Sequence, residues 1–215
     1  MGIRTRIGLL VAAFIVITVP ATAQLQTHPS SSKTDLVSHV TEYGKALPPV
    51  GFVSFCGRNP ESCSRGQSKP TIVDLTPERW GLLNEVNTSV NKKIAPMSDQ
   101  DLFGEPEYWT YPVDAGDCED YVLLKKRFLE NLGFSASALL ITVVLDENGD
   151  GHAVLLIETR KGDFVLDNRR TDIRLWSALD YKFLKRQSRR DPRMWVALTK
   201  SKTDAGELAS ESEQR

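Results

Sequence analysis

The chain has 215 residues with 27 basic and 28 acidic side chains, which gives a formal net charge of −1. This balance provides neither the basic surface that nucleic-acid binding requires nor an acidic tail, so we expect no nucleic-acid partner. The length fits one ordinary domain with a hydrophobic core.

The N-terminus has the layout of a secretory signal peptide. Arg4 and Arg6 precede an apolar run from Ile7 to Val19, and the small residues Ala21-Thr22-Ala23 follow it. These segments match a positive region, a hydrophobic region and a cleavage site. A membrane anchor is the alternative, but the apolar run is short for a bilayer span, which takes about 20 residues. We therefore predict a signal peptide over residues 1–23 and export of the mature chain.

Residues 24–47 are polar and weakly periodic, so we expect a flexible N-terminal arm. Residues 48–70 are rich in Pro and Gly and predict a loop that contains Cys56 and Cys63. In an oxidising compartment these two cysteines are expected to form a disulfide rather than remain free thiols or bind a metal. Cys118 is then left without a partner.

The next elements alternate between a helix and a connector. Thr76 is a typical N-cap and Pro77 suits the first helical position, so a helix is predicted to begin there. Its apolar face is formed by Trp80, Leu83, Val86, Val90 and Ile94. The Pro and Gly residues of segment 95–116 exclude a continuous helix and predict a long connector.

A second helix is predicted to begin at Cys118. Asp117 suits the N-cap position, and Asp120 stands where a capping box has its acidic residue. Asn131-Leu132-Gly133 is a typical helix end. The residues expected to face inward are Tyr121, Leu124, Phe128 and Leu132.

The segment from Ser137 to Asp167 predicts three antiparallel strands. Its apolar, β-prone runs are separated by "DENGDG" and "TRKGD", which are typical turns. The first turn resembles the start of an EF-hand loop, but its twelfth position is Ile157, where a bidentate Glu is needed, so we reject a metal loop. Residues 175–188 predict an amphipathic helix, and 199–215 predict a disordered tail.

The surroundings of Cys118 have opposite effects on its ionisation. A helix N-terminus favours an anion, and cysteines there are often reactive thiolates. The flanking carboxylates Asp117, Glu119 and Asp120 oppose a thiolate. An inert buried thiol is the alternative, since free cysteine is common in cores.

A nucleophilic thiol needs a base held by a third group, and the strands offer both. His152 begins the second strand and Asp167 ends the third, whereas His28 and His39 lie in the predicted arm. If Lys161-Gly162 is the centre of a symmetric turn, His152 and Asp167 share a sheet face but stand four residues out of register. A bulge or an off-centre turn must then close the gap.

Three motifs together resemble one known family. The strings "GDCEDYVLLKKRFLENLGF", "GHAVLLIE" and "FVLDN", with the upstream "RWGLLNEVNTSVNKKI", are similar to the bacterial transglutaminase-like cysteine peptidases. The resemblance covers about residues 50–195 and implies an α+β fold with a papain-like or transglutaminase-like core, in which N-terminal helices pack on an antiparallel sheet. It implies a domain over 48–198 and a catalytic triad of Cys118, His152 and Asp167.

The resemblance also implies a cofactor and partners. LapG-type periplasmic proteases of this family release adhesins from the cell surface and bind Ca²⁺ through acidic residues beside the nucleophile. Carried over, the calcium ligands are Asp117, Glu119 and Asp120. The implied substrate is a protein, such as a large surface adhesin, and relatives are held by an inner-membrane receptor that responds to a cyclic dinucleotide. A link to biofilm formation follows.

The motifs leave two other functions open. Transglutaminases pass the same acyl-enzyme to an amine, so the sequence does not separate hydrolysis from acyl transfer. A non-catalytic family member that only binds a partner is the other alternative. The N–H of Cys118 is one expected oxyanion donor, and Asn91 or Trp109 are the candidates for the second.

Overall fold

The computed structural model describes Gly2 and the ranges 38–64 and 69–200. The chain divides into the units Met1–Asp35 and Leu36–Arg215, and every helix and strand below belongs to the second unit.

Several predictions lie outside the described residues. These are the signal peptide over 1–23, positions 24–37 of the arm and 201–215 of the tail. None of the described helices has both the length and the apolar character that a membrane crossing requires.

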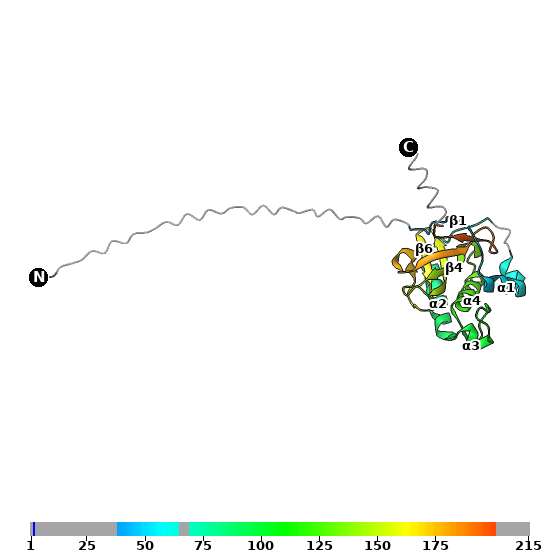
Figure 1. Ribbon diagram of the computed structural model, residues 1–215. Coiled ribbons are helices and arrows are strands. Elements are labelled where there is room, and N and C mark those ends of the chain that lie inside the picture. Colours follow the sequence, from blue (N-terminus) through cyan, green and yellow to red (C-terminus); the bar gives the residue numbers. More distant parts are fainter. Residues whose placement is uncertain (1, 3–37, 65–68, 201–215) are drawn as a thin grey trace, which may run out of the picture. The chain divides into compact units, whose positions relative to one another are not determined.

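The helices lie mainly in the first half of the unit (Figure 1). The helices of the described residues are α1 Val50–Arg58, α2 Pro77–Lys93, α3 Asp99–Phe103 and α4 Cys118–Asn131. Short 3₁₀ turns span Pro60–Cys63, Ala136–Ala138 and Trp176–Ala178.

The strands form one large sheet and one small one. The large sheet has the order β1-β9-β8-β4-β5-β6-β7, and all its neighbouring strands are antiparallel. Its strands are β1 Gly44–Ala46, β4 Leu139–Leu145, β5 Gly151–Thr159, β6 Gly162–Leu166, β7 Arg174–Leu175, β8 Lys182–Gln187 and β9 Trp195–Ala197. The short strands β2 Ala95–Pro96 and β3 Ala115–Gly116 pair in parallel. The predicted α+β class with an antiparallel sheet is confirmed.

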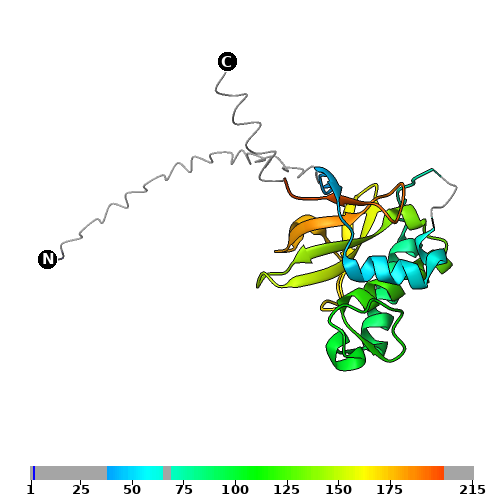
Figure 2. The ribbon, with the colours of Figure 1, turned by 45° about the vertical axis from the view of Figure 1, so that its right-hand side comes forward.

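Helices α2 and α4 pack against each other, and α4 packs on β5 (Figure 2). The main core lies between these helices and the sheet, where Leu83, Val90 and Leu129 meet Leu155 and Ile157. A second buried cluster on the other sheet face is formed by Val40, Leu140, Val144, Val154, Leu156, Val165, Phe183 and Leu198. Because side chains alternate along a strand, β5 contributes its odd-numbered residues to one cluster and its even-numbered residues to the other.

Both predicted helix starts are confirmed, but their caps differ. Thr76 Oγ1 accepts the N–H of Arg79 at 3.3 Å, and Pro77 is the first helical residue of α2. Asp117 stands at the N-cap position of α4, yet its side chain makes no capping hydrogen bond. The predicted capping role of Asp117 is therefore wrong, and its carboxylate remains available for other contacts.

The predicted inward face of α4 is only half right. Tyr121 and Leu124 are buried, but Phe128 is 36% and Leu132 47% exposed. Leu129, at 0% exposure, fills the core at that level instead.

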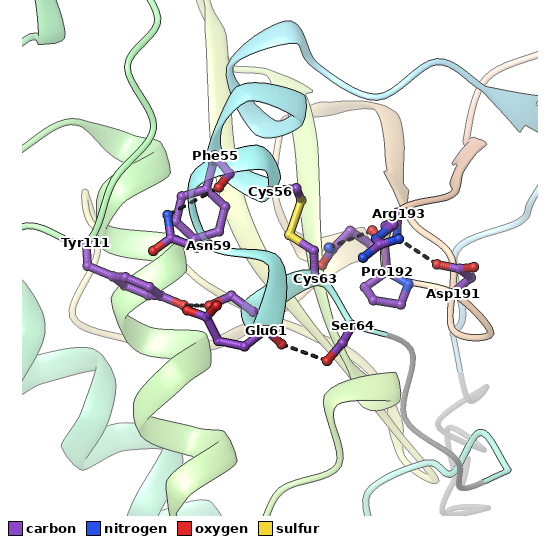
Figure 3. The surroundings of a disulfide bond; sticks show 12 residues. Phe55, Cys56, Asn59, Glu61, Cys63, Ser64, Tyr111, Asp191, Pro192 and Arg193 are labelled. Carbon is purple, nitrogen blue, oxygen red and sulfur yellow. Dashed lines mark hydrogen bonds between the residues drawn. A yellow bond between two sulfur atoms is a disulfide. The ribbon is translucent and has the colours of Figure 1, made fainter.

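The loop predicted for residues 48–70 is wrong in its first part. Residues 50–58 form α1, which buries Phe52 and Phe55. The predicted disulfide is confirmed: Cys56 in α1 is bonded to Cys63 at the end of the next 3₁₀ turn (Figure 3). The contacts of two phenylalanines with the core outweigh the Pro and Gly content on which the loop prediction relied.

The helix predicted for 175–188 is also wrong, because this segment supplies β8 between β4 and β9. Pairing with two neighbouring strands overrides local helical propensity. Residues 44–46, expected in the arm, form β1 on the edge beside β9. The connector 95–116 contains α3 and the paired strands β2 and β3.

Candidate active site

Cys118 stands at the first position of α4, and only Asp117 separates it from the short strand β3. Pairing of β3 with β2 fixes this segment beside the C-terminal end of α2. The cysteine is half-buried and has no disulfide partner, and its thiol donates a hydrogen bond to Glu119 Oε2 at 2.9 Å.

His152 and Asp167 are in direct contact. His152 Nε2 lies 3.0 Å from Asp167 Oδ1, and both side chains are almost completely buried. The same carboxyl oxygen accepts the N–H of Arg169 at 2.9 Å, and the Tyr181 hydroxyl donates to Asp167 Oδ2 at 2.7 Å. Burial alone would raise the pKa of Asp167, but these donors outweigh it and lower the pKa to about 2.

The turn between β5 and β6 explains how these side chains meet. Thr159 pairs with Gly162, so the turn is centred one residue earlier than the symmetric turn assumed from the sequence. Leu166, the last residue of β6, pairs with Leu155. In the same register the next residue, Asp167, comes opposite Val154. The offset from His152 is then two residues instead of four, and such diagonal neighbours are within reach of an aromatic side chain. The pairing of β5 with β6 contains no bulge.

The hydrogen bond to Asp167 determines which imidazole nitrogen is free. Because the carboxylate is ionised and only accepts, His152 Nε2 donates, and in the neutral imidazole Nδ1 then has the lone pair. Nδ1 is buried and has no hydrogen-bond partner among the described residues. The imidazole is therefore oriented as a base with one unused nitrogen.

The sulfur of Cys118 lies near the strand end that carries His152. The N–H of Ala153, the next residue, acts on this sulfur and lowers its pKa. The net effect is nevertheless a raised pKa, because burial and the charge of Glu119 both disfavour the thiolate. Within the described part of the chain, no hydrogen bond joins Cys118 to His152, since the thiol donates to Glu119.

Three carboxylates gather next to Cys118. One oxygen from each of Asp99, Asp117 and Asp120 lies within 4.8 Å of the others. Asp120 Oδ1 accepts the N–H of Thr110 at 2.8 Å, and Asp99 Oδ2 accepts the N–H of Tyr108. The oxygens Asp99 Oδ1, Asp117 Oδ1 and Asp120 Oδ2 are buried without a hydrogen-bond partner in the described residues.

This acidic cluster resists ionisation. Burial, followed by the charge of Glu119, raises the pKa of Asp117 to about 9, and burial raises that of Asp120 to about 7. Buried oxygens without donors are the ligands that Ca²⁺ prefers, so the cluster fits a hard divalent cation. Gly116 leaves room for the Asp120 carboxylate in this cluster, because a Cβ there would lie 2.6 Å from Asp120 Oδ2.

The predicted metal ligands are only partly brought together. Asp117 and Asp120 belong to the acidic cluster, whereas the carboxylate of Glu119 is engaged by the thiol. Asp99 was missed, because nothing in the acidic connector distinguishes it from Asp101 before the chain folds. It starts α3, which brings it to the cluster.

Other contacts of the site were also missed. Tyr181, which holds Asp167, lies in the segment predicted to be a helix. Its ring meets that of His152 edge to face, with centroids 6.0 Å apart. The amide of Asn91 donates to Asp167 O and Arg170 O, and Trp109 Nε1 donates to Glu107, so neither is free as a second oxyanion donor.

A cysteine at a helix N-terminus, near a strand-borne His that a carboxylate orients, defines a thiol enzyme of papain-like architecture. The chain belongs to the bacterial transglutaminase-like cysteine proteinases, whose sequence profile matches residues 42–203. This match confirms the family and the cysteine peptidase class predicted from the motifs. A peptidase of this class acts on a protein substrate.

Comparison with solved structures finds LapG of Legionella pneumophila. The calcium-bound form is 25% identical, with a TM-score of 0.49, over 60% of this chain and 74% of the other. The EGTA-treated form is 24% identical, with a TM-score of 0.48, over 66% and 81%. A search of curated proteins gives no match. Family membership therefore rests on the profile match.

Proposed function

We propose that the protein is a calcium-dependent cysteine endopeptidase with Cys118 as nucleophile, His152 as base and Asp167 as the residue that orients the imidazole. The observation that carries this proposal is the buried His152–Asp167 pair, which leaves His152 Nδ1 without a partner among the described residues. His152 directly precedes Ala153, whose N–H acts on the Cys118 sulfur.

In the proposed reaction the thiol proton moves from Cys118 to His152 Nδ1. The sulfur bonds to the carbonyl carbon of a peptide, and the carbonyl oxygen takes up negative charge near the N–H of Cys118. The C–N bond then breaks, and the leaving amine takes the proton from Nδ1. Water hydrolyses the acyl-enzyme with His152 as base, and Asp167 stabilises the charged imidazole throughout.

The acidic cluster is the proposed calcium site. Asp99, Asp117 and Asp120 would hold the ion, and Glu119 is a further predicted ligand. Bound calcium supplies positive charge that offsets these carboxylates. Ligation of Glu119 would also take away the acceptor that now holds the Cys118 proton.

We further propose that the enzyme acts in the periplasm, where the predicted signal peptide would direct it. The proposed substrate is a surface protein such as a large adhesin, and an inner-membrane cyclic-dinucleotide receptor is the proposed regulator. These proposals are supported by the N-terminal pattern and the resemblance to LapG-type proteases.

The test incubates the protein with an adhesin fragment in calcium and in EGTA. We expect cleavage in calcium, little in EGTA, and none from Cys118→Ala. Cleavage by Cys118→Ala would overturn the triad assignment. Product mass separates the alternatives, because hydrolysis adds water, whereas acyl transfer to an amine joins chains.

A further inference from the structure

Helix α4 buries a lysine that the proposed reaction does not use. Lys125 follows Cys118 by seven residues, or two turns, so both lie on the same face of the helix. Lys125 is 0% exposed, and its Nζ donates to Asn87 Oδ1 of α2 at 2.7 Å.

The partners of Asn87 on its two sides agree on the orientation of its amide. Lys125 Nζ donates this bond, so the Asn87 oxygen faces Lys125 and the amide nitrogen faces the other way. There the nitrogen donates to the carbonyls of Arg170 and Thr171 at 3.0 and 3.2 Å. These carbonyls only accept, so both sides of the amide agree, and Asn87 links Lys125 of α4 to the loop that follows β6.

Asn91, one turn further along α2, binds the same loop. Its amide nitrogen donates to the carbonyls of Asp167 and Arg170, each at 2.8 Å. The backbone of Asp167, whose carboxylate contacts His152, is therefore held by α2. Lys125 links α2 in turn to α4, the helix that carries Cys118.

We propose that Lys125, Asn87 and Asn91 are positioning residues that set the Asp167 loop, and through it the His152 imidazole, relative to the Cys118 helix. This inference rests on the proposed triad. It connects the nucleophile to its base through the protein interior.

The cost of burying Lys125 supports such a role. Removing an ammonium from water is unfavourable, and an apolar side chain would fill the same space at lower cost. Burial lowers the pKa of Lys125 to about 7, while the charge of Asp167 acts in the opposite direction. Without Lys125 the buried Asn87 oxygen would lose its donor, and an apolar residue would not replace it.

The chain offers a matched control in the neighbouring residue. Lys126 is also buried, but its Nζ lies 2.9 Å from Glu130 Oε1 and donates to the carbonyls of Ala136 and Leu139. Lys125→Met and Lys126→Met each remove one buried ammonium from α4, and only the first affects the Asp167 loop.

The experiment measures two properties in calcium at one fixed pH. One is the rate at which iodoacetamide alkylates Cys118, and the other is the downfield proton resonance of His152 Nε2–H bonded to Asp167. For Lys125→Met we expect alkylation about tenfold slower and a weakened or shifted resonance, as a misplaced base predicts. Lys126→Met should keep the wild-type alkylation rate and resonance, even if its thermal midpoint falls as much as that of Lys125→Met.

Asn87→Asp provides a second variant in case Lys125→Met does not fold. It keeps an oxygen for Lys125 but loses both N–H donors to the loop, so it should reproduce the Lys125→Met effects. If Asn87→Asp keeps the wild-type rate and resonance, or if the two lysine variants behave alike, the positioning role is overturned.

Failure of the triad is distinguishable from failure of this inference. His152→Ala should slow alkylation in the otherwise unchanged protein. An unaffected alkylation rate in His152→Ala would overturn the proposed function itself. If His152→Ala slows alkylation but Lys125→Met keeps the wild-type rate and resonance, only the positioning role is overturned.

Discussion

The site contains two groups of buried carboxylates with opposite surroundings. Asp167 accepts hydrogen bonds from His152, the Arg169 N–H and Tyr181, and its pKa falls to about 2. Asp117 and Asp120 are buried beside other acids, and burial followed by the neighbouring negative charges raises their pKa values to about 9 and about 7. The first carboxylate is satisfied by the protein alone, whereas the second group needs protons or a cation.

The largest expected effect comes from removing the charge of the satisfied carboxylate. Asp167→Asn keeps the size of the side chain but destabilises the Nδ1-free tautomer of His152, so the cleavage rate should fall by about 10³-fold. Initial rates on the adhesin fragment measure this. Asp172→Asn, at an exposed aspartate paired with Arg174, is the control and should stay near wild type. An Asp167→Asn enzyme with the wild-type rate would remove Asp167 from the triad.

The next effect concerns the acidic cluster, in which each carboxylate has one buried oxygen without a donor among the described residues. Calcium at 100 times its Kd should stabilise the wild-type protein by about 2.7 kcal/mol, because it binds the folded state. Asp120→Asn should lose most of this gain in thermal unfolding, whereas Asp101→Asn, exposed on α3, should keep it. Glu119→Gln tests the remaining predicted ligand. Equal stabilisation of Asp120→Asn and wild type would argue against a calcium site here.

The two groups should also respond oppositely to pH. Without calcium the folded Asp117 and Asp120 retain protons that the unfolded chain releases above the ordinary pKa of 3.8, so the free energy of unfolding should fall as pH rises from 3.8 to about 9. The contribution of Asp167 is present above 3.8 and is lost as pH falls towards 2. Urea unfolding across pH measures both trends. Calcium should flatten the first trend, the fall in the free energy of unfolding as pH rises. The same slope against pH in EGTA and in calcium would contradict the comparison.

The smallest effect on the reaction is expected from a region that neither group touches. Replacing Cys56 and Cys63 by Ser removes the bridge between α1 and the 3₁₀ turn, which should cost about 2 kcal/mol of stability. The cleavage rate at 25 °C should stay unchanged. Urea unfolding and initial rates check both statements, and a loss of rate without a loss of stability would show that α1 supports the site.

Local signals in the sequence predict the elements that carry the proposed triad. Thr76-Pro77 marks the start of α2, Cys118 begins α4, and alternation with turn residues predicts the strands β4 to β6. These signals depend on neighbours within a few residues. Phe52 and Phe183 illustrate the failures, because long-range packing places them in a helix and a strand that local composition does not indicate.

The sequence by itself determined the family, the order of Cys118, His152 and Asp167 along the chain, and the acidic surroundings of the thiol. Only the tertiary structure decided that β5 and β6 pair with a two-residue offset between His152 and Asp167, and that Asp99 and Tyr181 join the site. The physical reason is that strand register and helix docking depend on burial of residues far apart in the chain, which no local pattern encodes.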